Sequence, residues 1–382
     1  MLINSEIISS DARLLEIVNS SSELNHIGLD LESNGFHRYQ ECVCLLQLCI
    51  KNKIYLIDTL AIGEIEPLRK ILENSAIEKI IHSAQHDIRS IDRDWNFHLK
   101  NLFDTSIASA FVGSTRLGLA NVLKEQMNIE IKKDKELQRA DWTIRPLNDE
   151  LKEYAATDVL HLFELRELLK DKLNNLGRIS WVQEEFSRLT EIRYSPTNKD
   201  FLDIKGSKKL NGNGLSILKE LHHFRESQAM KRDVPSFRIL PDSTLVMIAD
   251  EPSLDLTQVR GLVNYHNQKF LSALELAIRR GTKAKPIKRK KHTKNQVTNL
   301  TQKQLQNSRK RLQQLRNWRL VLAKQLDLPP GLLWPAASLQ RLARQPDCFD
   351  EEHFSEEVRT WQHSEFGSSL RKLINSFSSV TG

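Results

Sequence analysis

Two acidic residues lie two positions apart in a short apolar segment near the N-terminus. Asp30 and Glu32 belong to residues 27–32 (IGLDLE), a segment that favours a strand. Side chains alternate between the two faces of a strand, so both carboxylates share one face. Two neighbouring carboxylates repel each other unless a cation lies between them, so the pair can hold a hard divalent cation, although edge strands often carry such a pair without one.

Three further side chains extend this acidic set. Asp87 follows the apolar segment 79–81 at the start of a helical pattern, where a carboxylate can also simply cap the helix. Asp104 is the stronger candidate for such a capping role. Tyr154 and Asp158 are four residues apart in a helical segment and share one face, where a tyrosine hydroxyl can orient water beside a metal-bound carboxylate. Taken singly, this pair is more typical of a helix surface.

The elements that must position these residues alternate between strand and helix over the first two hundred residues. Three short apolar segments are rich in strand formers and predict an antiparallel meander: residues 27–31, 42–50 and 53–57. Residues 65–73 then predict a helix, and residues 79–81 a fourth, buried strand. From residue 86 to about residue 176 the pattern is mainly helical. The sequence therefore predicts an α/β domain with an early sheet and a helical second half.

After residue 197 the pattern becomes all-α and then repeats itself. At an offset of 94, Phe224 matches Trp318, Arg225 matches Arg319, Ala229 matches Ala323, Leu245 matches Leu339, Ile248 matches Leu342 and Pro252 matches Pro346. At an offset of 96, Phe270 matches Phe366, Leu274 matches Leu370 and Ile278 matches Ile374. One offset that holds across a whole unit, with a single slip, predicts a duplicated helical domain.

Residues 282–311, between the two helical units, contain eleven Lys or Arg and no Asp or Glu. Because they include so few apolar residues, we expect a flexible connector. Its densest stretch is Lys288-Arg289-Lys290-Lys291, which can be a solvated spacer or a tether that follows the phosphates of a nucleic acid. Of the formal net charge of +7, this connector contributes +11, which leaves about −4 for the rest of the chain.

The bulk composition predicts a globular protein with two or three domains in 382 residues. Its positive net charge favours a polyanionic partner. Cys42, Cys44 and Cys49 fall in one apolar segment, which favours a buried strand over a disulfide framework, and no second Cys/His pair follows to complete a zinc site. No apolar run approaches the length of a membrane span, and no signal peptide pattern is visible. We therefore expect a soluble, cytoplasmic protein without a membrane partner.

The acidic residues, in this order and spacing, resemble the DEDD exonuclease superfamily in its tyrosine-containing branch. Their flanking residues 139–142 (RADW), 145–147 (RPL) and 153–159 (EYAATDV) look like the third exonuclease motif of the ribonuclease D family, and residues 101–105 (NLFDT) also fit it. The helical repeats resemble HRDC domains. The resemblance implies an α/β, RNase H-like 3′-5′ exonuclease domain followed by two all-α HRDC-like domains. The expected boundaries are 1–195 for the exonuclease domain, 208–281 for the HRDC domain, 282–311 for the basic connector and 312–378 for a second, diverged HRDC-like domain.

The resemblance also assigns roles to individual residues. Asp30, Glu32, Asp87 and Asp158 are expected to bind two Mg²⁺ or Mn²⁺ ions, and Tyr154 to orient the water that attacks the phosphodiester in line. The implied reaction releases nucleoside 5′-monophosphates from the 3′ end of RNA. The family's substrates imply tRNA precursors or other structured RNA, and we expect a monomer.

Four residues near these motifs are open to two interpretations. Trp142 and Arg145 can frame the 3′-terminal nucleotides or belong to the core. His82 and His86 are interpreted as structural or substrate-lining, because Tyr154 occupies the place that a sister branch of the superfamily gives to a catalytic histidine.

Two other functions compete with an exoribonuclease. A 3′→5′ deoxyribonuclease keeps the fold and changes only the substrate, and contacts to the 2′-hydroxyl distinguish the two. Paired HRDC-like domains without a helicase or polymerase region favour the ribonuclease. A non-catalytic RNA-binding scaffold is typically marked by the loss of an acidic ligand, whereas all four are present here together with Tyr154.

Overall fold

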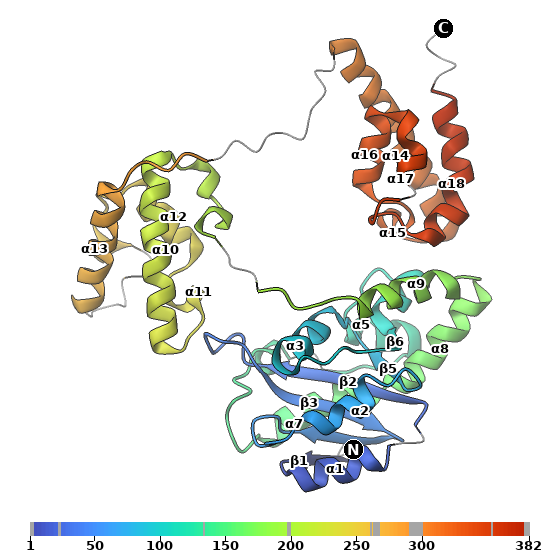
Figure 1. The fold of residues 1–382 in the computed structure, drawn as a ribbon. Helices are drawn as coiled ribbons and strands as arrows, with labels where there is room; N and C mark the ends of the chain where they lie inside the picture. Colours follow the sequence, from blue (N-terminus) through green and yellow to red (C-terminus); the bar gives the residue numbers. More distant parts are fainter. Residues whose placement is uncertain are drawn as a thin grey trace.

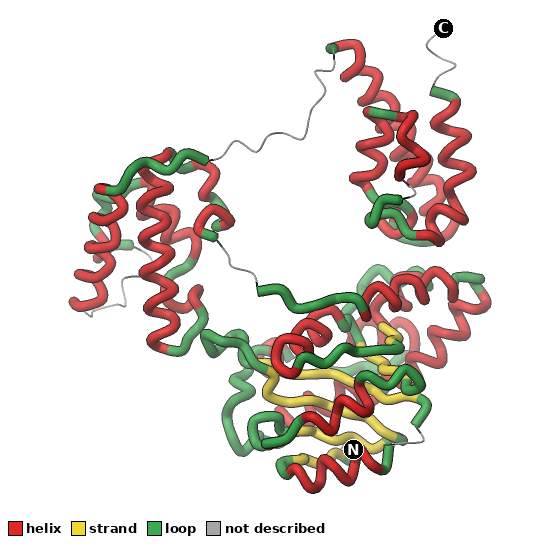
Figure 2. Tube along the Cα trace, viewed as in Figure 1, coloured by secondary structure: helices red, strands yellow, loops and turns green. Residues whose placement is uncertain are grey.

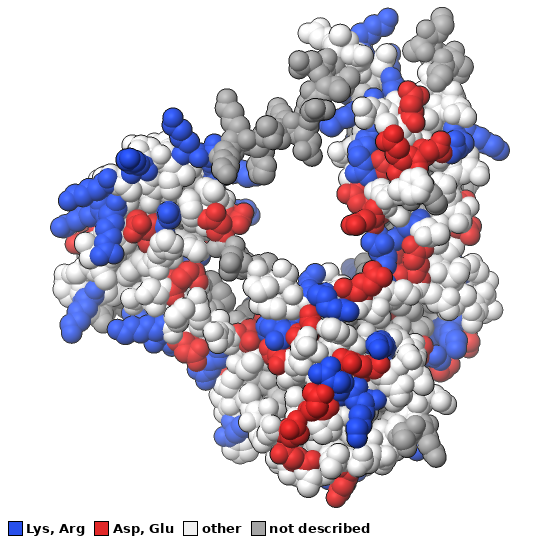
Figure 3. Space-filling model, in the orientation of Figure 1, with Lys and Arg blue, Asp and Glu red and all other residues white. Residues whose placement is uncertain are grey.

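The structure is a computed structural model that describes residues 4–21, 24–132, 134–196, 200–259, 262, 268–289, 301–352 and 354–377. It forms three bodies (Figure 1): an α/β domain up to residue 196, a first helical unit (residues 200–289) and a second helical unit (residues 301–377). Within the described chain all strands lie in the α/β domain, as Figure 2 shows. In the space-filling view the three bodies surround an open central space (Figure 3).

The α/β domain is built on a six-stranded sheet with the order β1-β4-β3-β2-β5-β6. Its strands are β1 (Ser5–Ile8), β2 (His26–Ser33), β3 (Val43–Ile50), β4 (Lys53–Ile57), β5 (Glu78–Ile81) and β6 (Leu102–Asp104). β2, β3 and β4 form the predicted antiparallel meander. β5 and β6 extend the sheet in parallel beyond β2, and β1 pairs in parallel with β4. The sequence analysis missed β1 and β6, because four and three residues are too few to show a strand pattern.

Helices cover both faces of this sheet. One face is covered by α1 (Asp11–Asn19), α2 (Arg69–Leu72), which continues η1 (Glu66–Leu68), and α3 (Gln85–Trp95). The other is covered by α4 (Thr105–Phe111), α5 (Leu119–Met127), α7 (Asp149–Leu160), α8 (Leu162–Asn175) and α9 (Ile179–Thr190). The short α6 (Lys135–Gln138) precedes α7. β3 is buried along its whole length, so its sequence is a continuous apolar run broken by one polar residue, Gln47.

The two helical units contain corresponding helices. The first comprises η2 (Phe201–Asp203), η3 (Ser207–Lys209), α10 (Gly212–Arg232), α11 (Ser236–Ile239), α12 (Asp242–Asp250), η4 (Leu256–Gln258) and α13 (Gln268–Lys283). The second comprises α14 (Gln302–Leu326), α15 (Pro330–Leu333), α16 (Ala336–Arg344), η5 (Pro346–Cys348), α17 (Phe349–Glu352) and α18 (Thr360–Asn375). The first unit has a hydrophobic core of its own, whereas the core of the second is continuous with that of the α/β domain.

The offset of 94 recurs in the structure of the two units. α15 and α16 begin and end 94 residues after α11 and α12. Arg225 donates to the carbonyl of Leu240 at 3.2 Å, and Arg319 donates to the carbonyl of Trp334 at 2.7 Å, again 94 residues later. The corresponding arginine therefore ties the long first helix to the turn before the third helix in both units.

The expectation of a flexible connector from residue 282 to residue 311 is wrong at both ends. α13 continues to Lys283, and the residues after it pack on α10, where Ile287 N–H donates to the carbonyl of Gly212 at 3.0 Å. α14 begins at Gln302 behind a capping box at Thr301. A Thr-x-x-Gln capping box is a helix start that the high density of basic residues obscured. Residues 290–300 lie outside the described residues.

Among the described residues no helix is both long and apolar enough to cross a membrane. Cys44 and Cys49 are buried in β3, and Cys42 lies just before it, so the prediction of a strand for this segment is confirmed.

Candidate active site

Asp30 and Glu32 lie on the face of β2 that α7 covers. Leu29 and Leu31 belong to the core on the opposite face, so the predicted alternation is confirmed. α7 also crosses β3 and β4 on this side of the sheet. The strand thereby presents two carboxylates to one helix.

Asp87 reaches the same side of the molecule from the first turn of α3. The turn that precedes α3 is held by Asp104, whose carboxylate accepts N–H groups of Ser83 at 3.2 Å and Ala84 at 2.8 Å. Asp104 also caps α4, as predicted, by accepting from Ser106 at 2.8 Å. The N-cap residue of α3, Ala84, makes no side-chain cap, and the carboxylate of Asp87 accepts its own backbone N–H while it lines the cavity.

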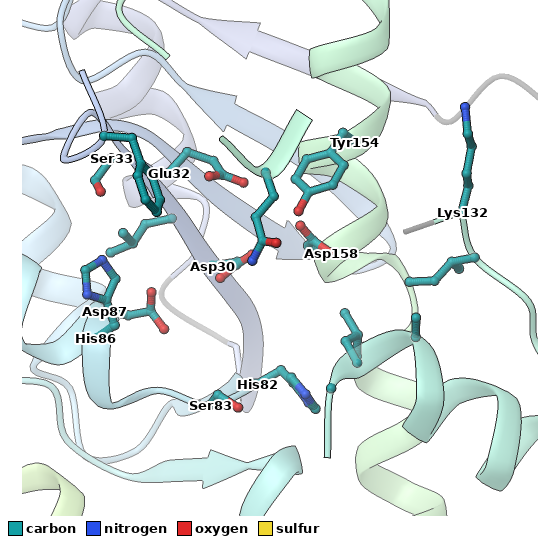
Figure 4. A pocket seen from close by; sticks show the side chains of 17 residues that line it. Asp30, Glu32, Ser33, His82, Ser83, His86, Asp87, Lys132, Tyr154 and Asp158 are labelled. Carbon is teal, nitrogen blue, oxygen red and sulfur yellow. The ribbon is translucent and has the colours of Figure 1, made fainter. Parts of the chain in front are cut away.

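Tyr154 and Asp158 are one turn apart on α7 and face the strand carboxylates. The ring of Tyr154 lies 6.2 Å from that of Trp142, centroid to centroid, and this packing fixes its direction. In Figure 4 the Tyr154 hydroxyl points toward the carboxylate of Asp158, with Asp30 beside them and Asp87 across the cavity. The helical spacing therefore places both groups where the sequence predicts.

One cavity of about 410 Å³ brings all five motif residues together. Its wall also includes Phe36, Lys132 and the start of α5 at Gly118. Three separate segments of the chain, β2, α3 and α7, supply the acidic side chains. The five residues singled out from the sequence therefore line the same cavity.

Burial and mutual repulsion dominate the electrostatics of this cavity. Desolvation, and then the charges of Asp87, Asp158 and Glu32, raise the pKa of Asp30 well above its usual value. Desolvation raises the pKa of Asp158 to about 7. The pKa of Glu32 is raised by desolvation and by Asp158 and Asp87, and that of Asp87 by desolvation and by Asp104. Ionisation of these four carboxylates is therefore unfavourable in the cavity, and a bound cation would offset the unfavourable free energy.

Divalent cations fit the chemistry of this cavity. Carboxylate oxygens are the ligands that Mg²⁺ and Mn²⁺ prefer. Among the described residues no Lys, Arg or His forms an ion pair with any of the four carboxylates, so their charge is not neutralised by the protein. Within the same residues no three acidic, His or Cys side chains already form a group that holds a metal ion. The cavity supplies the ligands and the charge, but not a closed ligand shell.

Trp142 and Arg145 do not line the cavity, and their surroundings favour the core interpretation over contacts to RNA. Trp142 is 1% exposed and belongs to the core beneath Tyr154. The guanidinium of Arg145 binds both carboxylate oxygens of Asp58, at 2.6 and 2.7 Å, and donates to the carbonyl of Cys44 at 3.0 Å. Arg145 thus ties the segment before α7 to the end of β4, and its donors are not available to a phosphate.

The basic residues of the connector are placed only in part. Lys288 is exposed, and Arg289 packs on the first helical unit, where it donates to Ser207 Oγ at 2.9 Å. The predicted RNA contacts at Lys290 and Lys291 lie outside the described residues.

The two histidines differ in exposure and partners. His82 Nε2 donates to the carbonyl of Leu117 at 2.7 Å, and its Nδ1 lies 2.8 Å from Thr105 Oγ1, so its ring braces the wall of the cavity. His86 has a side chain that is 62% exposed and lies 3.6 Å from Glu41 at the rim. Both positions agree with the structural and substrate-lining interpretation.

Two residues at or beside the cavity were not predicted from the sequence. Phe36 follows β2 and is 49% exposed, which is unusual for an aromatic side chain beside an acidic site. Gln47 lies buried in β3 opposite Asp30. The sequence contained a signal for each of them. Gln47 is the single polar residue in an apolar strand, and Phe36 is an aromatic residue four positions after Glu32.

The fold and the cavity together define a 3′-5′ exonuclease. A family model described as 3′-5′ exonuclease matches residues 5–174, and a model of the HRDC domain matches residues 214–273.

Sequence similarity to known proteins identifies the family. The chain is 31% identical over 284 residues to ribonuclease D of Zymomonas mobilis, covering 71% of this chain and 72% of that protein. It is 30% identical over 248 residues to ribonuclease D of Desulfotalea psychrophila, covering 64% of this chain and 66% of that protein. The match thus spans about two thirds of the relatives' own length. The chain belongs to the ribonuclease D family of 3′-5′ exoribonucleases, and this membership implies dependence on divalent metal ions.

Solved structures show the same fold over nearly the whole chain. Escherichia coli RNase D, described as an exoribonuclease involved in structured RNA processing, has a TM-score of 0.68 and 21% identity over 98% of this chain and 99% of that one. A protein from Bifidobacterium adolescentis has a TM-score of 0.79 and 19% identity over 97% of both chains. The RNase H-like exonuclease domain followed by helical domains is therefore the architecture of this chain.

Proposed function

We propose that this chain removes nucleotides one at a time from the 3′ end of RNA and releases nucleoside 5′-monophosphates. Asp30, Glu32, Asp87 and Asp158 are the proposed ligands of two Mg²⁺ or Mn²⁺ ions, and Tyr154 the residue that orients the attacking water. The observation that carries the proposal is that these five side chains line one cavity although they come from three separate segments.

The cations and Tyr154 have different roles in the proposed reaction. When bound, the cations supply Lewis acidity that activates water and offsets the charge on the departing 3′-oxygen. The hydroxyl of Tyr154 keeps its proton, because desolvation and the charges of Asp158, Glu32 and Asp30 raise its pKa. It therefore acts as a hydrogen-bond donor and acceptor for water and not as a base.

The 3′-terminal nucleotides have contacts available on the cavity wall. The ring of Phe36 offers a stacking surface that every base can use. The positive end of α5 at Gly118 lines the same space, which suits a phosphate, and the exposed Lys132 lies at its edge with its ammonium group pointing away from the carboxylates (Figure 4). This arrangement supports a single-stranded 3′ end in the cavity.

The body of the RNA requires a second contact surface. Exposed basic side chains gather on the first helical unit (Figure 3): Lys231, Arg232, Lys269, Arg279, Arg280 and Lys283. Such a surface binds phosphates without reading sequence and loses affinity as salt rises. We propose that it holds structured RNA, such as a tRNA precursor, while the free 3′ end is shortened.

The proposal includes the domain boundaries, the oligomeric state and the cellular location. We propose an exonuclease domain over residues 1–195, a first HRDC domain over 208–281, and a second HRDC-like domain that begins with α14 near residue 302 and not at 312. All five motif residues come from one chain, which supports a monomer as the active form. Because the enzyme must meet its RNA, we propose the cytoplasm as its location.

The test is digestion of a structured RNA that carries a 3′ extension and a 5′ label, with Mg²⁺ or with EDTA, by wild type and by Asp30→Ala. We expect a ladder that shortens by one nucleotide per step and that EDTA or the substitution abolishes. Degradation of single-stranded DNA without cleavage of RNA would replace the proposal with a deoxyribonuclease. Binding of RNA without cleavage would leave a non-catalytic scaffold.

A further inference from the structure

Gln47 is a buried amide without a hydrogen-bond partner. Its side chain is 0% exposed, and neither its Nε2 nor its Oε1 has a partner among the described residues. Elsewhere in the described chain no side chain leaves two buried polar atoms unpaired. Because an unpaired buried amide costs free energy, such a group requires a specific reason.

The register of the sheet places Gln47 directly beside Asp30. The two residues are opposite each other in the antiparallel pair of β2 and β3, so their side chains project from the same face of the sheet. The next residues on that face of β3 are Leu45 and Cys49, and the residue opposite on β4 is Leu56, all of which are buried hydrophobics. The carboxylate of Asp30 is thus the polar group that the sheet brings alongside this amide.

Asp30 has few other hydrogen-bond donors. Its carboxylate receives a backbone hydrogen bond from Leu31, and no side chain of the described residues donates to it. Metal-binding carboxylates commonly receive an outer hydrogen bond that fixes the orientation of the ligand. A side-chain donor is therefore present next to a carboxylate that has only a backbone donor among the described residues.

We propose that Gln47 is the positioning residue of Asp30. Its Nε2 donates a hydrogen bond to one carboxylate oxygen of Asp30 and so turns the other oxygen toward the cavity. This inference rests on the proposed role of Asp30 as a metal ligand and adds a residue to that site.

The test compares Gln47→Met, which keeps the length of the side chain and removes its donor, with Leu45→Met on the same face of the same strand. Affinity for Mn²⁺ is measured by calorimetry on the full chain, together with the melting temperature in EDTA and kcat and KM on RNA. For Gln47→Met we expect a loss of Mn²⁺ affinity of about 10-fold to 100-fold, as is usual for outer hydrogen-bond partners. We also expect a lower kcat at unchanged KM, and a melting temperature in EDTA that does not fall. Leu45→Met should leave the affinity within about twofold of wild type.

Two results would overturn the proposal. Wild-type Mn²⁺ affinity in Gln47→Met would show that the amide does not act on the site. A melting temperature that falls equally in Gln47→Met and Gln47→Leu, with proportionate losses of kcat and affinity, would show a purely structural role. Asp30→Asn separates this question from the proposed function: if that substitution leaves Mn²⁺ affinity unchanged, the metal site itself is wrong.

Discussion

The two helical units have the same order of helices but meet the exonuclease domain through different chemistry. In the second unit, the ring of Trp361 at the start of α18 stacks on Trp181 of α9, with centroids 4.8 Å apart and an angle of 14°. The carboxylate of Glu184 accepts the N–H groups of Thr360 and Trp361, and Arg359 pairs with Glu185 at 2.9 Å. A buried aromatic pair framed by charges joins the two bodies into one core.

The first unit touches the exonuclease domain through polar atoms. Tyr39 N–H donates to the carboxylate of Asp233 at 3.2 Å, and its hydroxyl donates to Glu226 at 3.4 Å. Arg238 Nη2 lies 3.2 Å from His37 Nδ1. These contacts are exposed or half-buried, and Tyr39 is the side chain of the exonuclease domain that packs on the core of the first unit.

The second unit is attached through a buried core, and the first unit mainly through polar contacts. Buried aromatic contacts are costly to break, whereas polar contacts at the surface exchange with water at little cost. The segment that carries Tyr39 also carries Phe36, which lines the active-site cavity. We therefore expect the second unit to stay fixed to the catalytic core, and the first unit to be the one whose position relative to the cavity can change.

The largest expected effect is that of Trp361→Ala. Loss of a buried tryptophan costs roughly 3–5 kcal/mol, and here the loss falls on the contact between two bodies. In wild type we expect the exonuclease domain and the second unit to unfold in one transition. The variant should separate them into two transitions in calorimetry. Trp318→Ala, which removes a ring that packs on Trp334 inside the second unit, is the control. One transition at the wild-type temperature in Trp361→Ala would contradict the fixed attachment.

The next effect is the pH dependence of stability in EDTA. The pKa of Asp158 is raised to about 7, so the folded state binds more protons than the unfolded state between about pH 4 and pH 7. This contribution to stability without metal is therefore full at low pH and lost as pH rises toward 7, and the part lost between pH 5 and pH 7 is on the order of 2 kcal/mol. Measurement below pH 7 avoids Lys79, whose pKa is lowered to about 7 by burial and whose contribution has the opposite sign above that pH.

This pH dependence sharpens the comparison between the units. The transition shared by the exonuclease domain and the second unit should move to lower temperature from pH 5 to pH 7. The transition of the first unit should not follow it, because desolvation lowers the pKa of His222, and a base with a lowered pKa adds stability as pH rises. Asp158→Asn should flatten the slope. Stability that rises over this range, or a first unit that moves in parallel, would argue against the assignment.

Gly281→Ala should damage only the first unit. A Cβ at this position would lie 2.4 Å from the Cα of Ile217, because α13 and α10 cross at the glycine. Overpacking of this kind costs roughly 1–3 kcal/mol. We expect the first unit to melt earlier while exonuclease activity on short single-stranded RNA is retained. Gly331→Ala in the second unit, where a Cβ meets nothing within 4 Å, is the matched control. A parallel loss in the exonuclease domain would show that the first unit is coupled to it rigidly.

The parts of the site that follow local periodicity could be predicted from the sequence. Asp30 and Glu32 depend on the two-residue repeat of a strand, and Tyr154 and Asp158 on the turn of a helix. The meander of β2 to β4 follows from three apolar segments with short connections. Each of these inferences needs only neighbouring residues.

The parts that depend on distant partners could not be predicted. Arg145 stands beside the third motif like a substrate contact, but its partner Asp58 is 87 residues away. Glu184 caps α18 from 176 residues away at Thr360, and no local signal distinguishes it from a surface acid. The two helical units therefore look equivalent in sequence, although only the second has a hydrophobic core continuous with that of the exonuclease domain.

The smallest expected effect, that of Tyr39→Phe, tests the adjustable attachment directly. The substitution removes only the hydroxyl, whose bond to Glu226 is long at 3.4 Å and half-buried. We expect a change in unfolding free energy of about 0.5 kcal/mol or less. Tyr39→Ala, which also removes the ring from the edge of the first unit's core, is the comparison variant. A loss in Tyr39→Phe as large as that in Trp361→Ala would show that both units are held rigidly. The first unit would then have no freedom to move the segment of Phe36, and its basic surface would have to present RNA to the cavity in one fixed orientation.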